Sequence, residues 1–476
     1  MPILLTDVTY RTRWMETRFP FRYGIAAMTK LPHLFLSANA VIDGREVVGL
    51  ASEGLPPKWF TKNPETTFEQ DLPEMLRVIE QAVTFGREVE AESLFTWWLA
   101  VYRKQDAWAR ENGIPPLLAH LGTSLIERAM IDATCRAHGI GFAEAVNKNA
   151  FGIDLGAIHH ELAGSQPADW LGNTLTSLIA RHTVGLGDPL FANEIPEEDR
   201  ADDALPQALT DTIDAYGLTH FKVKVCGKLE VDVPRLKRLA GIFAEKVPGY
   251  RLTLDGNEQY RTIAKFREHW EAYLAEPELC DFLSPAHLIF VEQPMYRDDA
   301  LKEEVKEGLA SWTEAPPMII DESDADLTSL RCALELGYRG TSHKNCKGVF
   351  KGLANKCLIE WHRREHPEQQ WLMSGEDLAN VGPVALLNDL EVMATLQIDD
   401  IERNGHHYFK GLSMFPRALQ EQVVAAYPSL YAMEDAGYAT LKIHNGRLDV
   451  SELAGPGFGC AVDPTGDDLG VPGLPR

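Results

Sequence analysis

The feature that most constrains the fold is a series of charged residues, each placed directly after a short apolar run. The segment Phe221–Val225 reads Phe-Lys-Val-Lys-Val, so Lys222 and Lys224 share one face of a strand. Two neighbouring ammonium groups on a buried strand are costly unless anions balance them. The residues that close the following apolar runs are Asp255, Glu292, Asp321 and Lys344.

The spacing of these residues indicates a repeated unit of one strand and one helix. Positions 222, 255, 292, 321 and 344 lie 33, 37, 29 and 23 residues apart, and about 30 residues per unit is typical of βα repeats. A closed barrel gathers catalytic groups at the C-terminal ends of its strands, whereas an open doubly wound sheet would not bring five consecutive strand ends around one point. The sequence therefore predicts an α/β fold with a (β/α)8 TIM-type barrel, whose seventh and eighth strands are expected at 371–375 and 407–412.

The N-terminal part has a different pattern, which predicts a separate α+β capping domain. Strands are expected at Thr6–Trp14 and Leu34–Val48, which are rich in β-branched and apolar residues. Helical spacing of apolar residues follows at 68–85 and 93–112. The segment Ser124-Leu-Ile-Glu127 resembles a capping box at the start of a further helix.

Two loops in this part contain aromatic residues and prolines. Residues 19–30 and 52–62 are either surface connections or lids over a neighbouring site, and the sequence favours neither interpretation. For the whole chain we predict a capping domain at 1–155, a barrel at 156–430 and a C-terminal segment at 431–476 that returns to the capping domain.

The net charge of −24 argues against nucleic acid or an anionic membrane as a partner, because both bind basic patches. A small carboxylate substrate remains compatible, since the charge at a site can oppose the overall sign. No N-terminal signal segment is visible, and no apolar run approaches the ~18 residues that a membrane helix needs. Seven scattered cysteines without a CxxC pattern favour reduced thiols. We expect a cytoplasmic homo-oligomer.

Three of the strand-end residues have the chemistry of a metal site. The carboxylates of Asp255, Glu292 and Asp321 are hard oxygen ligands without His or Cys among them, which suits Mg2+, with Mn2+ as a second possibility. Asn257 shares the face of Asp255 and is expected to orient a ligand, and Glu322 is expected to lie behind Asp321. The metal would act as a Lewis acid for a carboxylate or carbonyl oxygen.

The lysines have the chemistry of acid–base catalysis. Lys224 and Lys344 belong to the second and sixth predicted strands, which face each other across a barrel. A nearby divalent cation and a second lysine are expected to lower the pKa of such a lysine, so that it can act as a base. Two bases on opposite faces of one carbon describe abstraction of the proton alpha to a carboxylate, through an enediolate that the metal stabilises.

These motifs resemble the enolase superfamily, in its muconate-lactonising and dipeptide-epimerase-like branch. The matching segments are Lys222-Val-Lys224, Asp255-Gly-Asn257, Val291-Glu-Gln-Pro294, Asp321-Glu-Ser323 and Lys344-Asn-Cys-Lys-Gly348. The resemblance implies Mg2+ on the three carboxylates, Lys224 and Lys344 as opposed acid/bases, and Lys222 near the substrate carboxylate. It also implies that the capping domain closes two loops over the substrate, and 19–30 and 52–62 are similar to those loops.

The seventh strand is expected to end at Ser374-Gly-Glu376-Asp377 without a histidine. This argues against a histidine base there, as in sugar-acid dehydratases and mandelate-racemase-like enzymes. Glu376, Asp377 and His407 are candidates for contact with substrate. Racemisation, epimerisation or cycloisomerisation is the favoured reaction. The alternatives are syn-dehydration of an acid by a lyase, a non-catalytic metal-binding barrel, and a metal-dependent aldolase, which would usually show His ligands.

Overall fold

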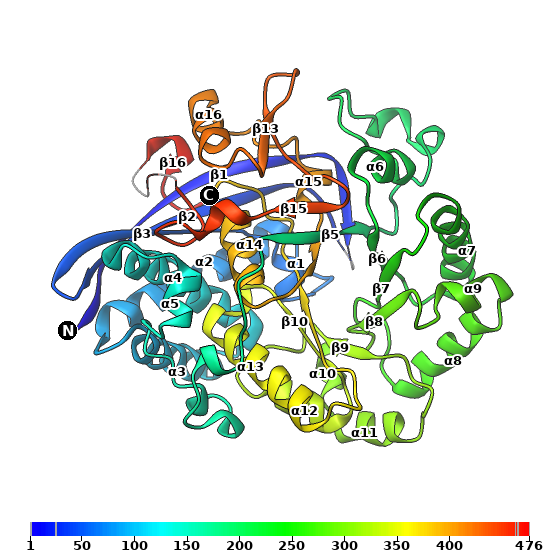
Figure 1. The fold of residues 1–476 in the computed structure, drawn as a ribbon, viewed down its shortest axis with the longest axis horizontal. Coiled ribbons are helices and arrows are strands. Elements are labelled where there is room, and N and C mark those ends of the chain that lie inside the picture. The colour runs from blue at the N-terminus through cyan, green and yellow to red at the C-terminus, as the bar shows by residue number, and fades with distance from the viewer. Residues whose placement is uncertain (1, 24–25, 462, 464–465, 476) are drawn as a thin grey trace.

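The computed structural model describes residues 2–23, 26–461, 463 and 466–475, and its larger part is a closed barrel of parallel strands surrounded by helices (Figure 1). The eight barrel strands are β5 (Ser177–Val184), β6 (His220–Lys224), β7 (Arg251–Asp255), β8 (Leu288–Glu292), β9 (Met318–Ile320), β10 (Gly340–His343), β11 (Leu372–Gly375) and β12 (Asp400–Arg403). Each strand pairs with the next, and β12 pairs with β5 in parallel, which closes the barrel. The predicted (β/α)8 fold is therefore confirmed.

The eighth strand was predicted in the wrong place. It is β12 (Asp400–Arg403), whereas the predicted strand at 407–412 begins inside the short helix α15 (Gly405–Tyr408). The aromatic residues of this segment pack against the capping domain instead of pairing in the barrel. The ring of Tyr408 stacks on Phe21 with the centroids 4.1 Å apart.

Helices between the strands cover the outside of the barrel. They are α6 (Leu209–Tyr216), α7 (Leu229–Lys246), α8 (Ile263–Leu274), α9 (Pro277–Phe282), α10 (Arg297–Ala300), α11 (Glu303–Ala310), α12 (Ser329–Leu336), α13 (Val349–Glu365) and α14 (Ala385–Thr395). Helix α6 ends at Gly217 with φ 63°, a left-handed conformation that costs glycine little and turns the chain into β6. The following C-terminal segment holds α16 (Arg417–Ala426), β13 (Tyr431–Met433), β14 (Ala439–Leu441) and β15 (Arg447–Asp449), and β15 pairs antiparallel with β5.

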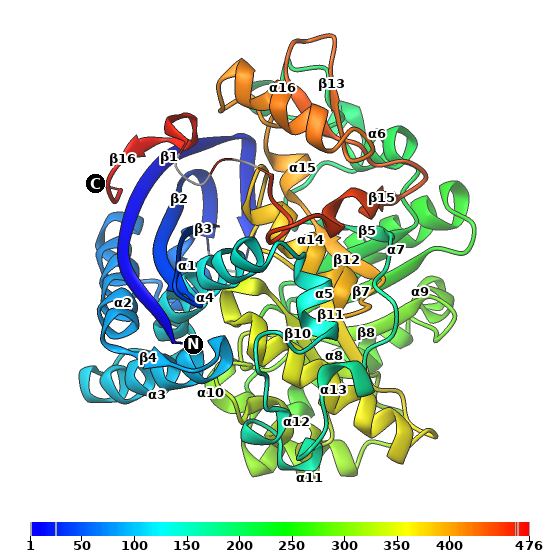
Figure 2. The same cartoon turned by 60° about the vertical axis from the view of Figure 1, so that its left-hand side comes forward.

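The N-terminal part is an antiparallel sheet packed against helices, as Figure 2 shows. Its strands are β1 (Ile3–Tyr23), β2 (Ala26–Ile42), β3 (Arg45–Gly54) and β4 (Glu90–Ala91), and β16 (Val471–Pro472) near the C-terminus pairs with β1. Its helices are α1 (Pro57–Phe60), α2 (Phe68–Glu88), α3 (Leu94–Asn112), α4 (Pro116–His138) and α5 (Phe142–Asn147). The tail thus returns to the capping domain, while the exact domain boundaries stay a prediction.

Three local predictions in this part were wrong. The predicted loop at 19–30 includes residues 24 and 25, which lie outside the described part of the chain, and on both sides of them β1 and β2 continue to pair, as far as Tyr23 and Ala26. Residues 52–62 include the end of β3 and the helix α1. Ser124 and Glu127 lie in the middle of α4 and do not cap it. The Glu127 carboxylate instead accepts the backbone N–H groups of Val349 and Phe350, 3.2 and 2.7 Å away, at the start of α13.

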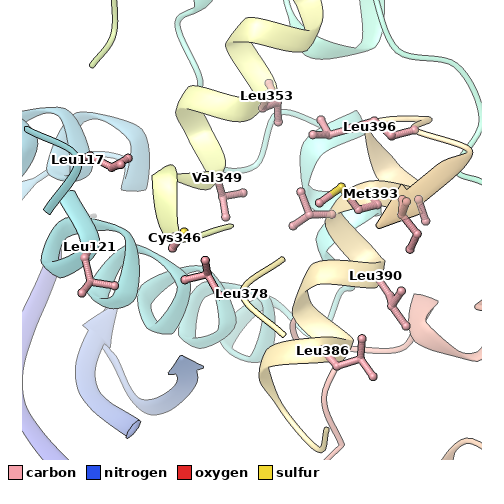
Figure 3. Close-up of a cluster of buried hydrophobic side chains, with 14 of the residues drawn as sticks. Leu117, Leu121, Cys346, Val349, Leu353, Leu378, Leu386, Leu390, Met393 and Leu396 are labelled. Carbon is pink, nitrogen blue, oxygen red and sulfur yellow. The ribbon is translucent and has the colours of Figure 1, made fainter. Parts of the chain in front are cut away.

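The interface between the capping domain and the barrel is an apolar core. Figure 3 shows Leu117 and Leu121 of α4 facing Val349 and Leu353 of α13, with Leu390 of α14 on the other side. All five side chains are at most 3% exposed. Burial of this extent ties the two domains together, since each buried aliphatic side chain contributes roughly 1.5–3 kcal/mol.

We expect the Glu127 contact to make stability depend on pH. Burial raises the pKa of Glu127 to about 8, against the lowering effect of the two N–H groups. Between the unfolded and folded pKa values the folded state holds a proton that the unfolded state has lost, so the free energy of unfolding falls as pH rises, by up to about 1.4 kcal/mol per pH unit. Denaturant unfolding of Glu127→Gln from pH 5 to 8 should show a flatter dependence than the wild type; equal slopes would contradict the prediction.

None of the helices in the described part of the chain is long and apolar enough to cross a membrane. The seven cysteines form no disulfide in this structure, and their reduced state in the cell stays a prediction. The cytoplasmic location and the homo-oligomeric state stay predictions.

Candidate active site

The C-terminal ends of the barrel strands carry a cluster of buried charged side chains. Its members are Lys222 and Lys224 in β6, Asp255 in β7, Glu292 in β8, Asp321 after β9, Lys344 after β10, Glu376 after β11 and Glu402 in β12. Alternation along each strand places these groups in the lumen and packs the intervening apolar residues against the helices. Five carboxylates face these three ammonium groups, and two further buried cations contact the same acids: Lys347 at Asp321 and Arg181 at Glu376.

The ammonium group of Lys222 lies among four of these carboxylates. Its Nζ is 2.8 Å from Glu292, 3.0 Å from Glu376, and 3.1 Å from both Glu402 and Asp255. Burial alone would lower the pKa of Lys222, but the four carboxylates outweigh it and raise the pKa well above its ordinary value. Lys222 therefore remains charged and acts as a fixed positive centre.

The other two lysines approach from opposite sides, because the second and sixth of eight strands face each other. Lys224 donates hydrogen bonds to Asp255 Oδ2 (2.7 Å) and Asn257 Oδ1 (3.0 Å). Lys344 donates to both oxygens of Asp321 (2.8 Å each) and to Glu376 Oε2 (2.7 Å).

The expectation of a lowered lysine pKa is not met for Lys344. Burial lowers the pKa of Lys344, but Asp321 and Glu376 outweigh it and raise the pKa well above that of free lysine. These two carboxylates reverse the expected direction of the shift: Asp321, which the sequence predicted as a metal ligand, and Glu376, which it predicted as a residue near the substrate.

Three carboxylates in the cluster fit a divalent cation. Ligand oxygens of Glu292, Asp321 and Glu376 all lie within 4.8 Å of one another. Burial and the neighbouring acids raise the pKa of Glu292 well above its ordinary value, and its Oε2 makes no hydrogen bond within the described part of the chain, although Lys222 Nζ is 2.8 Å away. Hard oxygen donors crowded in this way are stabilised by Mg2+ or Mn2+. Asp255 contacts both lysines of β6, and its predicted role as a ligand stays a prediction.

Neighbouring polar groups hold Asp321 in place. Lys347 Nζ lies 2.9 Å from Asp321 Oδ1 and donates to the Asp321 backbone carbonyl at 2.8 Å. The side-chain oxygen of Gln293 accepts the backbone N–H of Asp321 at 2.7 Å. Burial would raise the pKa of Asp321, but Lys344 and Lys347 outweigh it and keep the pKa low. This carboxylate is ionised and fixed in position.

Sequence analysis missed two members of the site. Glu402 was missed because the eighth strand was misplaced, although it follows Ile401 in an apolar–polar alternation. Arg181 lies in β5, for which no strand was predicted. Its buried guanidinium donates to Ser374 Oγ at 2.6 Å and contacts Asp400 and Glu376. The apolar run before Arg181 was the available signal.

A cavity of about 50 Å³ lies over the charged cluster. Of the predicted site residues, Lys222, Lys224, Asp255, Asn257, Asp321, Lys344 and Asp377 line it, together with Glu402 and Asn404. The capping domain contributes Phe21 and Met28 from the β1–β2 hairpin, and Pro56 and Trp59 from the segment after β3. Both predicted lid segments therefore reach the site, and the Trp59 ring lies 5.1 Å from Lys344 Nζ.

Four predicted site residues are outside the cavity lining: Glu292 and Glu376, which belong to the charged cluster, and His407 and Glu322. His407 is in α15, where its ring packs against Phe19 and His182 with centroids 5.0 and 4.9 Å away. Glu322 is buried behind Asp321 and lies close to Glu258 and Arg297.

The neighbouring Arg297 connects this region to the lid. It pairs with Glu258 at 2.7 Å and donates to the backbone carbonyls of Trp59 and Phe60, at 3.0 and 2.7 Å. Arg297 thereby fixes the segment that carries Trp59 over the barrel.

Comparison with known proteins gives a match at the level of structure. No family model matches the sequence, and no curated protein does. A dipeptide epimerase from Enterococcus faecalis, solved with Mg and the dipeptide L-Leu-L-Tyr, has a TM-score of 0.61 and 14% identity over 96% of this chain and 99% of its own. A mandelate racemase/muconate lactonizing protein from Herpetosiphon aurantiacus has a TM-score of 0.60 and 16% identity, over 95% of this chain and 98% of its own.

A muconate lactonizing enzyme from Pseudomonas fluorescens, solved with muconolactone, has a TM-score of 0.60 and 15% identity over 97% of both chains. The chain therefore has the fold of these enolase-superfamily proteins over nearly its whole length, as its strand-end motifs predicted.

Proposed function

We propose that the protein is an enzyme that removes the proton alpha to a substrate carboxylate and carries out a racemisation, epimerisation or cycloisomerisation. The observation that supports this most directly is the position of Lys224 and Lys344, which enter one cavity from opposite sides of the barrel. A carbon held between them has one amine on each face, which is the arrangement that proton exchange with inversion requires.

The contacts of the two lysines suggest different starting states. Lys344 is held by two carboxylates, whereas Lys224 contacts one carboxylate and the amide of Asn257. Lys344 is therefore the better proton donor, and Lys224 is the base that first accepts the alpha proton. Lys222 contributes a fixed positive charge at the floor of the cavity, next to the place where negative charge develops on the substrate.

Glu292 and Asp321, with Asp255 or Glu376, would hold Mg2+ or Mn2+. When bound, the cation would supply positive charge to the substrate carboxylate as a Lewis acid. The crowding of acids around Glu292 supports this assignment, because burial and these neighbours raise the pKa of Glu292 and its Oε2 makes no hydrogen bond within the described part of the chain.

Exchange of the alpha proton with solvent tests the proposed function. The protein is incubated in D2O with Mg2+ and a library of 2-substituted carboxylic acids, and deuterium incorporation is followed by NMR and mass spectrometry. We expect incorporation into at least one acid, with inversion or ring closure as the product, while loss of water would indicate a lyase. Tight binding of acids without exchange or turnover would contradict catalysis and favour the non-catalytic barrel.

Removal of divalent cations is expected to lower stability. Ligand binding to the folded state adds about 2.7 kcal/mol at one hundred times the dissociation constant. Thermal denaturation of chelator-treated protein should therefore shift upward when Mg2+ is added, and Asp321→Asn should lose this shift. Asp281→Asn changes an exposed carboxylate and is the matched control. The same shift in Asp321→Asn as in the wild type would show that this cluster does not bind the cation.

A further inference from the structure

The roof of the cavity differs chemically from its floor. Its side chains are apolar: Phe21, Met28, Pro56, Trp59, Leu378 and Ala379. A separate hydrophobic cluster holds part of this roof in place, in which Phe21 and Met28 pack with Leu31, Val381 and Tyr408. The described part of the roof is therefore an apolar surface that packs against the rest of the protein.

The polar groups at the edge of the cavity already have partners within the protein. Asp377 pairs with Arg403 and accepts the backbone N–H of Ala379. Glu402 accepts a hydrogen bond from Thr183 at 2.6 Å and contacts Lys222. Among the described residues that line the cavity, none is an arginine. The edge thus offers no free cation to a second carboxylate or a phosphate.

One hydrogen-bond acceptor in the cavity lining has no partner among the described residues. The side-chain oxygen of Asn404 is buried and has no hydrogen-bond partner within the described part of the chain. A buried unpaired carbonyl is costly, and a ligand that donates one hydrogen bond would satisfy it. A chain of hydroxyl groups would instead meet the apolar roof and remain unpaired.

The size of the cavity limits the substrate further. The cavity between the floor and the roof is small, about 50 Å³. Met28 and Pro56 also line a much larger outer groove, about 1140 Å³, together with Phe68 and Leu76. A longer acid would therefore have to extend past Met28 and Pro56 into this groove.

We propose that the substrate is a compact carboxylic acid with one hydrogen-bond donor at or beside the alpha carbon and a short apolar side chain. The inference rests on the proposed function, because it places the carboxylate at the lysines and the apolar side chain against the roof. Polyhydroxylated sugar acids and acids with a second charge are expected to bind this site poorly.

A matched pair of ligands tests the inference. 2-Hydroxybutyrate and glycerate differ only in a terminal methyl or hydroxyl group, and titration calorimetry with the Mg2+-loaded protein compares their dissociation constants. We expect 2-hydroxybutyrate to bind about tenfold more tightly, because the hydroxyl of glycerate would be buried without a partner. Deuterium exchange should follow the same order.

A variant tests the size limit. Met28→Ala should connect the cavity to the outer groove and strengthen the binding of 2-hydroxyhexanoate about tenfold relative to 2-hydroxybutyrate. Leu76→Ala, which changes the groove but not the cavity, should leave this ratio unchanged. An unchanged ratio in a folded Met28→Ala would overturn the size limit. If that variant does not fold, 2-hydroxyhexanoate binding to the wild type as tightly as 2-hydroxybutyrate would overturn it instead.

The outcomes separate the two proposals. Equal or tighter binding of glycerate would overturn the inference and leave the proposed function intact, provided that exchange occurs. Absence of both binding and exchange for every acid, with and without Mg2+, would contradict the proposed function and with it the inference.

Discussion

Replacement of Lys344 by alanine is expected to reduce exchange of the alpha proton of one substrate enantiomer by about 10²–10⁴-fold, the usual contribution of a general acid or base. The Lys344 ammonium group is fixed by Asp321 and Glu376 and lines the cavity, whereas Lys347, which also contacts Asp321, does not line it. The loss should appear in the rate and not in Mg2+ binding, because the carboxylates remain. Deuterium exchange measured by NMR gives the rate, and calorimetry with Mg2+ gives the binding.

The two lysines should differ in which enantiomer they serve. Lys224→Ala and Lys344→Ala are each expected to lose exchange for a different enantiomer of the substrate, since the amines lie on opposite faces. Lys356→Ala is the matched control, because Lys356 is also buried and paired with a carboxylate, Glu360, but lies outside the cavity. If the Lys224→Ala, Lys344→Ala double variant retained wild-type exchange, proton transfer by these lysines would be excluded.

The barrel and most of the site could be predicted from the sequence because buried charge is costly. A charged residue that closes an apolar run must find partners, and in a barrel these partners come from the neighbouring strand ends. That argument found the strands that end at Lys224, Asp255 and Glu292, and the positions of Asp321 and Lys344. It required only local alternation and a regular spacing.

The rest depended on contacts that local patterns do not contain. The segment 407–412 is more apolar and aromatic than β12, but its apolar residues serve the contact with the β1–β2 hairpin. Glu127 has the spacing of a capping box, yet it caps a helix that begins more than two hundred residues later. In both cases tertiary packing decided the role of the residue and outweighed the local pattern.

The same dependence on distant partners makes Arg128 a sensitive position. Its guanidinium in α4 lies 3.0 Å from Glu53 of β3 and donates to the backbone carbonyl of Ser52 at 2.9 Å, and neither Arg128 nor Glu53 is more than 1% exposed. Arg128→Ala would leave Glu53 as an uncompensated buried charge. Loss of one partner of a buried pair typically costs about 3–5 kcal/mol, and we expect a decrease of that size in the free energy of unfolding.

The loss of stability in Arg128→Ala should depend on pH, and the charged groups around Glu53 determine the direction of that dependence. Burial raises the pKa of Glu53, and Arg128 opposes this rise. Asp389 of α14 is close enough to Glu53 to interact with it, and burial and Glu53 raise the pKa of Asp389 as well. Without Arg128 the folded state would favour protonated Glu53 still more strongly, so the unfolded state would lose its proton first as pH rises. The variant should therefore be destabilised less at pH 5 than at pH 8.

Denaturant unfolding of Arg128→Ala and of the Arg128→Met, Glu53→Gln double variant at both pH values checks this. The double variant removes both charges and keeps comparable side-chain volume, so it should recover part of the lost stability, since a buried ion pair often contributes little beyond neutral groups of similar size. A single variant within about 0.5 kcal/mol of the wild type at pH 8 would mean that water reaches Glu53 and that the domain interface is more open than its packing indicates.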